Sequence, residues 1–111
     1  MKLNELVNKC EMQVVNKLYE PDREVSGGYT SDLLSDVIAN SKKDNVWITM
    51  QTHLNIIAVA SLKELSAIII VMGKDVQEDA KAKAEEEKIT ILKTDLTAFQ
   101  ISGKIYELGI Q

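Results

Sequence analysis

Ligands for a metal ion are scarce in this sequence, which has one cysteine and one histidine among 111 residues. An ordinary zinc site takes four protein ligands of these kinds, so we expect no metal and no cofactor. Cys10, the single cysteine, cannot form a disulfide within the chain, and this favours a reducing compartment such as the cytoplasm. We interpret Cys10 as a partly buried helix residue.

Long hydrophobic runs and basic clusters are also missing. The longest apolar segment, Ala67 to Met72, is too short to cross a bilayer, and the N-terminus has no signal-peptide pattern, so we expect no membrane association. The formal net charge is −4, and Lys42-Lys43 is the longest basic run. With few aromatic residues to stack on bases, the chain is not expected to bind nucleic acid.

The common catalytic motifs are absent. Gly73-Lys74 is followed by Asp75 and has no glycine five residues before it, so there is no phosphate-binding loop. Neither the dinucleotide-binding glycine pattern nor the serine nucleophile elbow occurs. The sequence therefore predicts a protein that is not an enzyme.

Apolar residues make up 45% and charged residues 27% of the chain, which is typical of a folded domain. Its length predicts one domain, residues 1–111. Apolar runs alternate with amphipathic segments, which predicts an α/β fold with right-handed crossovers and a mainly parallel sheet flanked by helices. We expect helices over Lys2–Cys10, Leu33–Ala39, Leu54–Leu65, Asp75–Glu87 and Leu96–Leu108, and strands over Met12–Leu18, Val46–Met50, Ala67–Val71 and Ile89–Leu92.

Polar residues next to these segments are candidate helix caps. We expect Asn4 to cap the first helix and Thr30 or Ser31 the second. Asp75 with Glu78 matches a capping box, and Thr94 or Asp95 precedes the last helix. Trp47 is expected in the core. For the adjacent Asp22 and Arg23, a local ion pair is one interpretation.

The carboxyl ends of parallel strands share one edge of a sheet, so three polar segments should lie along one rim: Gln51–Asn55, Met72–Asp75 and Lys93–Thr97. Helix N-termini there offer free N–H groups that suit a phosphate or carboxylate. The alternative is that these polar residues only cap their own helices. His53 has two equal interpretations, as a ligand contact or as a donor to a loop carbonyl. Gly27-Gly28 either forms a tight turn or permits the close approach of another group to the backbone.

Three blocks of the sequence together resemble the DRTGG domain family: Asp22–Tyr29 (DREVSGGY), Asp32–Val37 (DLLSDV) and Trp47–Ala60 (WITMQTHLNIIAVA), followed by a closing Leu-Gly-Ile at 108–110. The five letters of the family name are not contiguous here, because Glu-Val-Ser separates Asp-Arg from Gly-Gly. The resemblance covers about Leu3 to Ile110 and implies a three-layer α/β/α sandwich like the N-terminal domain of HPr kinase/phosphorylase. Members similar to this one are often labelled HPr serine kinases, but the kinase's phosphate-loop domain is absent.

The resemblance implies a regulatory module that forms a homodimer. Combined with the polar rim, it leads to the hypothesis that the domain binds a small anionic ligand such as an adenine nucleotide. The expected ligand-binding residues are Gly27, Gly28, Tyr29, Asp32, Thr52, His53 and Asn55. An alternative is an interaction domain that docks a larger partner enzyme without a ligand of its own. A kinase or hydrolase that depends on His53 is a third hypothesis.

Overall fold

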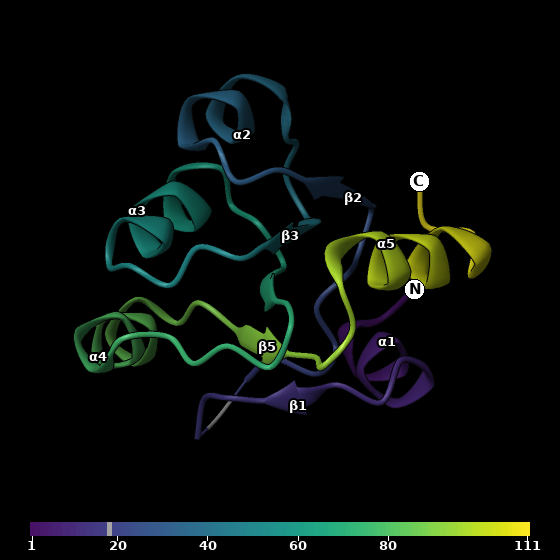
Figure 1. Ribbon diagram of the computed structural model, residues 1–111, viewed down its shortest axis with the longest axis horizontal. Helices are drawn as coiled ribbons and strands as arrows, with labels where there is room; N and C mark the ends of the chain where they lie inside the picture. The colour runs from purple at the N-terminus through teal and green to yellow at the C-terminus, as the bar shows by residue number, and fades with distance from the viewer. Residues whose placement is uncertain (18) are drawn as a thin grey trace.

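A five-stranded sheet forms the centre of the computed structural model, which describes residues 1–17 and 19–111 (Figure 1). Its strands are β1 (Gln13–Val14), β2 (Gly27–Thr30), β3 (Asn45–Thr49), β4 (Ala67–Ile70) and β5 (Ile91–Lys93). The spatial order is β1-β5-β4-β3-β2. Strands β2 to β5 pair in parallel, and β1 pairs antiparallel with β5. The predicted mainly parallel sheet is confirmed.

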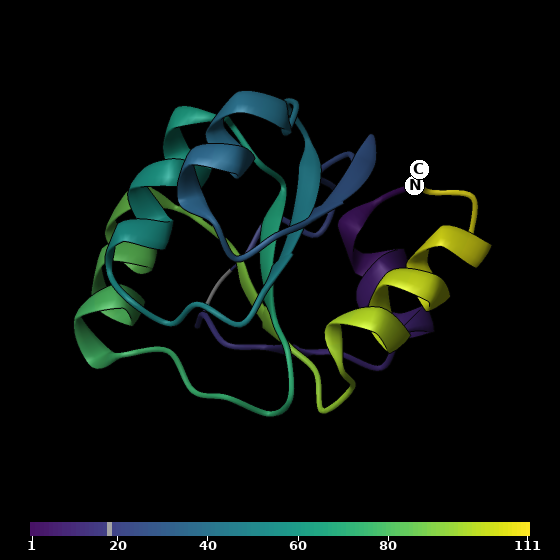
Figure 2. The ribbon, with the colours of Figure 1, turned by 45° about the horizontal axis from the view of Figure 1, so that its top comes forward.

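Helices cover both faces of this sheet, as Figure 2 shows. They are α1 (Leu3–Lys9), α2 (Leu34–Asn40), α3 (Asn55–Leu62), α4 (Glu78–Glu87) and α5 (Ala98–Glu107). Helices α2, α3 and α4 each connect two neighbouring parallel strands, and crossovers of one hand that step in one direction place all three on the same face. Helices α1 and α5 cover the other face, which gives the expected α/β/α sandwich.

The sheet is buried on both sides, so its apolar residues divide between two cores by the alternation of a β-strand. Ile69 and Leu92 pack with α1 and α5, whereas Ile68 and Ile70 pack with α2, α3 and α4. Trp47 belongs to the second core, is 0% exposed and donates from Nε1 to the Ser31 carbonyl at 2.8 Å. Its predicted place in the core is confirmed.

The expected caps of the first two helices were wrong. Asn4 lies inside α1, and Lys2 takes the N-cap position. The Asn4 N–H donates to the Pro21 carbonyl at 3.0 Å, so a neighbouring loop satisfies this end of the helix. At α2 the N-cap is Leu33, whose N–H donates to the Ser31 hydroxyl.

The caps expected for the last two helices also differ from those in the structure. Helix α4 begins after Gln77, and the Asp75 carboxylate pairs instead with the Lys93 ammonium group. Helix α5 begins after Thr97, whose hydroxyl accepts from the Gln100 N–H at 3.2 Å while Gln100 Oε1 accepts from the Thr97 N–H at 3.0 Å. This is a complete capping box one turn later than predicted.

Element ends shift by a few residues elsewhere. The strand expected over Met12–Leu18 forms only at Gln13–Val14, and Leu18 lies outside the described residues. Helix α3 ends at Leu62, before the positive-φ residue Glu64 turns the chain into β4. In residues 1–17 and 19–111, no helix has both the length and the apolar character to cross a membrane.

Candidate functional site

The carboxyl rim of the sheet is held together by Asp32. Its Oδ1 accepts hydrogen bonds from the Thr49 hydroxyl and the Met50 N–H, both at 2.8 Å. The Gln51 side chain donates to the Asp32 carbonyl at 2.9 Å. Asp32, one of the expected ligand-binding residues, therefore lies at the rim, where it joins the loop after β2 to the end of β3.

Thr52 and His53, from the first of the three segments predicted at this rim, lie between β3 and α3. The Thr52 carbonyl accepts from the Gln77 N–H at 3.1 Å, and His53 Nδ1 lies 2.9 Å from Gln77 Nε2. These contacts join the start of α3 to the start of α4. Gln77 was not among the predicted site residues, because no local pattern shows that it reaches His53.

The first turn of α3 begins at Asn55, which is exposed. This helix has neither a side-chain cap nor an acidic residue in its first turn. Its N-terminal dipole is thus not neutralised locally, in contrast to α4, whose first turn carries Glu78 and Asp79. Among the helix starts at the rim, α3 is the more favourable for an anion.

A groove of about 930 Å³ runs along α3 and α4 from this rim. Most of the apolar lining is one stripe at the start of and along α3, with Leu54, Ala58 and Leu62 at i, i+4 and i+8, and Ile57 adds to it. The remaining lining residues are His53, Asn55, Ser61, Gln77, Lys83 and Glu87. The groove therefore combines a largely apolar wall with polar groups contributed by both helices.

Lys83 is the cation of this groove. Its ammonium group lies 3.3 Å from a Glu87 oxygen and 3.6 Å from a Glu86 oxygen. The hydrogen bond to Glu87, followed by the charge of Glu86, raises the pKa of Lys83 above its ordinary value. Lys83 is thus a permanent positive charge at neutral pH, and its exposed acidic partners compete weakly with a ligand.

The structure does not bring the predicted glycines to this groove. Gly27 pairs with Asn45 and Gly28 with Val46, at the start of β3, whereas His53 follows the end of that strand. The expected proximity of Gly28 to His53 was wrong, because the strand separates them. The two glycines also form no tight turn, since they are the first residues of β2.

Close approach explains one of the two glycines. A Cβ atom on Gly27 would lie 3.0 Å from Asn45 Nδ2 and 3.4 Å from the backbone carbon of Gln111. Gly28 has only ordinary contacts with Val46. Gly27 therefore serves packing at the amino edge of the sheet.

Tyr29, the next predicted residue, faces α2. Its hydroxyl donates to Asp36 Oδ1 at 2.7 Å. This hydrogen bond is the main cause of the raised pKa of Tyr29. The Tyr29 hydroxyl is thus engaged with α2 and not with the groove.

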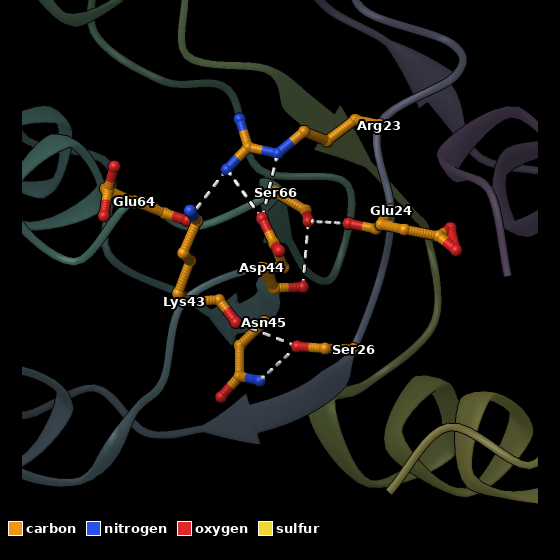
Figure 3. A network of polar contacts seen from close by, with 8 residues as sticks. All are labelled: Arg23, Glu24, Ser26, Lys43, Asp44, Asn45, Glu64 and Ser66. Carbon is orange, nitrogen blue, oxygen red and sulfur yellow. Dashed lines mark hydrogen bonds and ion pairs between the residues drawn. The ribbon is translucent and has the colours of Figure 1, made fainter.

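The rest of the Asp22–Tyr29 block forms a polar network at the amino edge (Figure 3). Arg23 donates from Nε and Nη2 to Asp44 Oδ1, at 3.1 and 3.0 Å, and from Nη2 to the Glu64 carbonyl at 2.8 Å. The Ser66 hydroxyl bonds to the carbonyls of Glu24 and Asp44. The interpretation of Arg23 as a local partner of Asp22 was wrong, because its carboxylate partner is Asp44 on another loop.

Among the residues with described positions, no group of three or more His, Cys, Asp or Glu side chains is placed to hold a metal ion. Cys10 is buried, and burial raises the pKa of its thiol. A thiol of this kind is a poor nucleophile at neutral pH.

No protein-family model matches this chain, and no curated protein matches it. Its fold is similar to a solved structure of the CBS and DRTGG domains from the regulatory region of Clostridium perfringens pyrophosphatase, complexed with its activator diadenosine tetraphosphate. The TM-score is 0.69 at 14% identity, and the match covers 94% of this chain and 45% of the other. This chain thus spans less than half the length of that protein. The likeness confirms a DRTGG-related fold.

Proposed function

We propose that this domain is a non-catalytic regulatory module that dimerises and binds a small anionic ligand with a planar apolar part, such as an adenine nucleotide. One observation carries the ligand half of the proposal: the groove along α3 and α4 includes His53 and Asn55, which the sequence had already singled out. Similarity in fold to a regulatory region supports a regulatory role.

The chemistry of the groove fits the two parts of a nucleotide. The stripe of Leu54, Ala58 and Leu62 offers an apolar surface for a base. The side chains of His53 and Asn55 offer hydrogen-bond donors for a phosphate, and the positive end of the α3 dipole, which no acidic residue of the first turn offsets, favours its charge. Thr52 and Asp32 hold the rim in place.

Three of the expected ligand residues stand outside this proposal. Gly27, Gly28 and Tyr29 lie on β2 and make their contacts at the amino edge and with α2. Substitution of any of these three residues is expected to leave the ligand affinity of the folded protein unchanged.

Calorimetry with AMP, ADP, ATP and diadenosine tetraphosphate tests the ligand half directly. A ligand at 100 times its dissociation constant adds about 2.7 kcal/mol of stability, which thermal unfolding detects.

His53→Ala and Asn55→Ala should weaken nucleotide binding by removing polar contacts, and Leu62→Asn should weaken it by making the apolar wall of the groove polar. Lys104→Ala is the control, because Lys104 is exposed on α5, on the opposite face of the sheet from the groove. Absence of binding by all four nucleotides at millimolar concentration would refute this half.

A second candidate function is docking of a partner protein in the same groove without a small ligand. It is favoured by Leu62, which is 67% exposed, and by Leu54, which is 42% exposed. An apolar stripe on a helix surface is a common protein contact. In this case Leu54→Asn and Leu62→Asn would abolish capture of the partner, whereas His53→Ala would leave it intact.

A further inference from the structure

The outer face of α5 carries two exposed aromatic side chains. Phe99 is 89% exposed and Tyr106 is 60% exposed. They are seven residues apart, so they lie two helical turns apart on one side of the helix. Ile101 and Ile105 occupy the opposite side and are buried against the sheet.

Contacts with the sheet fix the direction of this aromatic face. The Ser102 and Thr30 hydroxyl oxygens lie 2.8 Å apart, which joins α5 to the edge strand β2. Helix α5 lies on the same side of the sheet as α1, with its outer surface directed away from the rest of the domain (Figure 2). Phe99 and Tyr106 therefore point outward.

Gly103 lies between the two aromatic residues, one turn from each. A Cβ added there would meet nothing within 4 Å. Its φ is not in the positive region that requires glycine. A glycine inside a helix costs roughly 0.5–1 kcal/mol relative to alanine. No contact with residues 1–17 or 19–111 explains this glycine, whereas close approach by another helix would.

The order of residues along this face is symmetric. In an antiparallel pair of α5 helices centred between Ser102 and Gly103, Phe99 of each copy lies opposite Tyr106 of the other. The small residues meet at the centre, where they permit close contact of the backbones. Such a two-fold contact is self-complementary, as a symmetric dimer requires.

Charge is also complementary in that arrangement. Glu107 at the end of α5 lies opposite Ala98, the first residue of the same helix in the second copy. A carboxylate is stabilised near a helix N-terminus, and the two antiparallel helix dipoles attract. The two-fold contact therefore places the N-terminus of each α5 helix beside the C-terminus of the other.

We propose that a second copy of this chain packs on the face formed by Phe99, Gly103 and Tyr106, with the two α5 helices antiparallel. This inference rests on the dimerisation half of the proposed function and adds the surface that carries it. Phe99 and Tyr106 together expose on the order of 300 Å². Since a standard interface buries about 800 Å² per partner, the two aromatic residues supply a large part of one.

Sedimentation equilibrium across a range of protein concentrations tests this surface. The unmodified chain should form a dimer, and Phe99→Ala should raise its dissociation constant at least about tenfold, as expected for an aromatic residue buried in the contact. Lys104→Ala, an exposed substitution on the same helix but not on this face, should leave the dissociation constant unchanged. Equal dissociation constants for Phe99→Ala and the unmodified chain would overturn the proposal.

Two variants at Gly103 exclude a general loss of folding as the cause. Gly103→Ala should raise the melting temperature of the monomer at low concentration, because the helix gains propensity, and yet weaken the dimer. Gly103→Leu should prevent dimer formation while circular dichroism shows a folded monomer. A dimer that is unchanged by Gly103→Leu would refute the close contact of the helices.

The outcomes separate this inference from the proposed function. A chain that remains monomeric at all concentrations would overturn both dimerisation and the α5 surface. A dimer broken by Leu62→Asn and not by Phe99→Ala would keep dimerisation and refute the α5 surface. Nucleotide titration of Phe99→Ala should still show ligand binding, since the groove lies on the other face of the sheet.

Discussion

Arg23 Nη2 lies 3.0 Å from Asp44 Oδ1 and also donates to the carbonyl of Glu64. Both Asp44 and Glu64 have positive φ, at 66° and 51°, in the loops that lead into β3 and β4. Non-glycine residues adopt this conformation only when their surroundings hold it. One guanidinium group thus fixes the entry to two neighbouring strands.

Replacement of Arg23 by lysine should therefore destabilise the fold even though the charge is kept. A single ammonium group cannot reproduce the planar donors that contact Asp44 and Glu64 together. We expect a loss of about 1–2 kcal/mol in the free energy of unfolding, measured by urea denaturation. Lys43→Arg, at an exposed position in the same loop, is the matched control and should have no measurable effect. A neutral result for Arg23→Lys would mean that the loops hold their own conformation.

The two glycines of β2 should respond differently to alanine. At Gly27 the new methyl group would stand 3.0 Å from Asn45 Nδ2, which is tighter than ordinary contact, and we expect a loss of about 1–2 kcal/mol. At Gly28 the nearest atom, Val46 Cγ2, is 3.6 Å away, so alanine fits. Thermal unfolding of the two variants compares them directly. Equal stability would show that the Asn45 side chain moves aside at no cost.

The strands could be predicted from the sequence because burial on both faces leaves a local signal. Ala67–Ile70 is buried throughout, and its apolar run marks it without knowledge of its neighbours. The pairing of Arg23 with Asp44 has no such signal, since the two are 21 positions apart and three other acidic residues, Glu24, Asp32 and Asp36, lie in between. The role of Gly27 depends in the same way on Asn45.

Helix starts were predicted less well, because Asp, Asn and Thr side chains have partners other than their own helix. Asp75 illustrates this, as its carboxylate pairs with Lys93 on β5. At α5 the sequence did contain the correct signal, because Thr97 and Gln100 have the spacing of a capping box, whereas the predicted caps were Thr94 or Asp95. Of the predicted ligand residues, the rim members lie near one another because parallel strands share an edge, whereas the glycines lie at the opposite edge.

Acid should weaken the contact between β2 and α2. Hydrogen bonds from the side chains of Ser31, Tyr29 and Asn40, in this order of effect, lower the pKa of Asp36 below its ordinary 3.8. A carboxylate with a lowered pKa stabilises the fold at higher pH, and this contribution is lost as the pH falls through the folded-state pKa. Asp36→Asn should therefore lower the melting temperature at pH 7, and the difference from the unmodified chain should shrink between about pH 4 and pH 2. A constant difference over that range would show that ionised Asp36 has no such role.

Tyr29→Phe tests the same hydrogen bond from its donor. The bond to Asp36 raises the pKa of Tyr29 above 10.0, so the contribution of Tyr29 is present below that pH and lost as the pH rises through the folded-state pKa. At pH 7 Tyr29→Phe should lower the melting temperature, and the difference should shrink above about pH 10. Tyr106→Phe, at an exposed tyrosine on α5, provides the comparison, measured at a protein concentration where the chain is monomeric. A similar pH profile for both variants would contradict the assignment to Asp36.

Asn16 should be the most sensitive polar side chain near β1. Its Nδ2 donates to the Ile89 carbonyl at 2.7 Å and its Oδ1 accepts from the Ile91 N–H at 2.6 Å. One amide thereby satisfies two backbone groups at the start of β5, as a neighbouring strand would. Asn16→Asp keeps the acceptor but replaces the donor with a charge that faces the Ile89 carbonyl. We expect Asn16→Asp to cost about 2 kcal/mol in urea denaturation and to accelerate exchange of the Ile91 amide hydrogen. Asn8→Asp, at an exposed asparagine on α1, is the control for the added charge. An equal loss of unfolding free energy in both variants would contradict a stabilising role for the Asn16 hydrogen bonds.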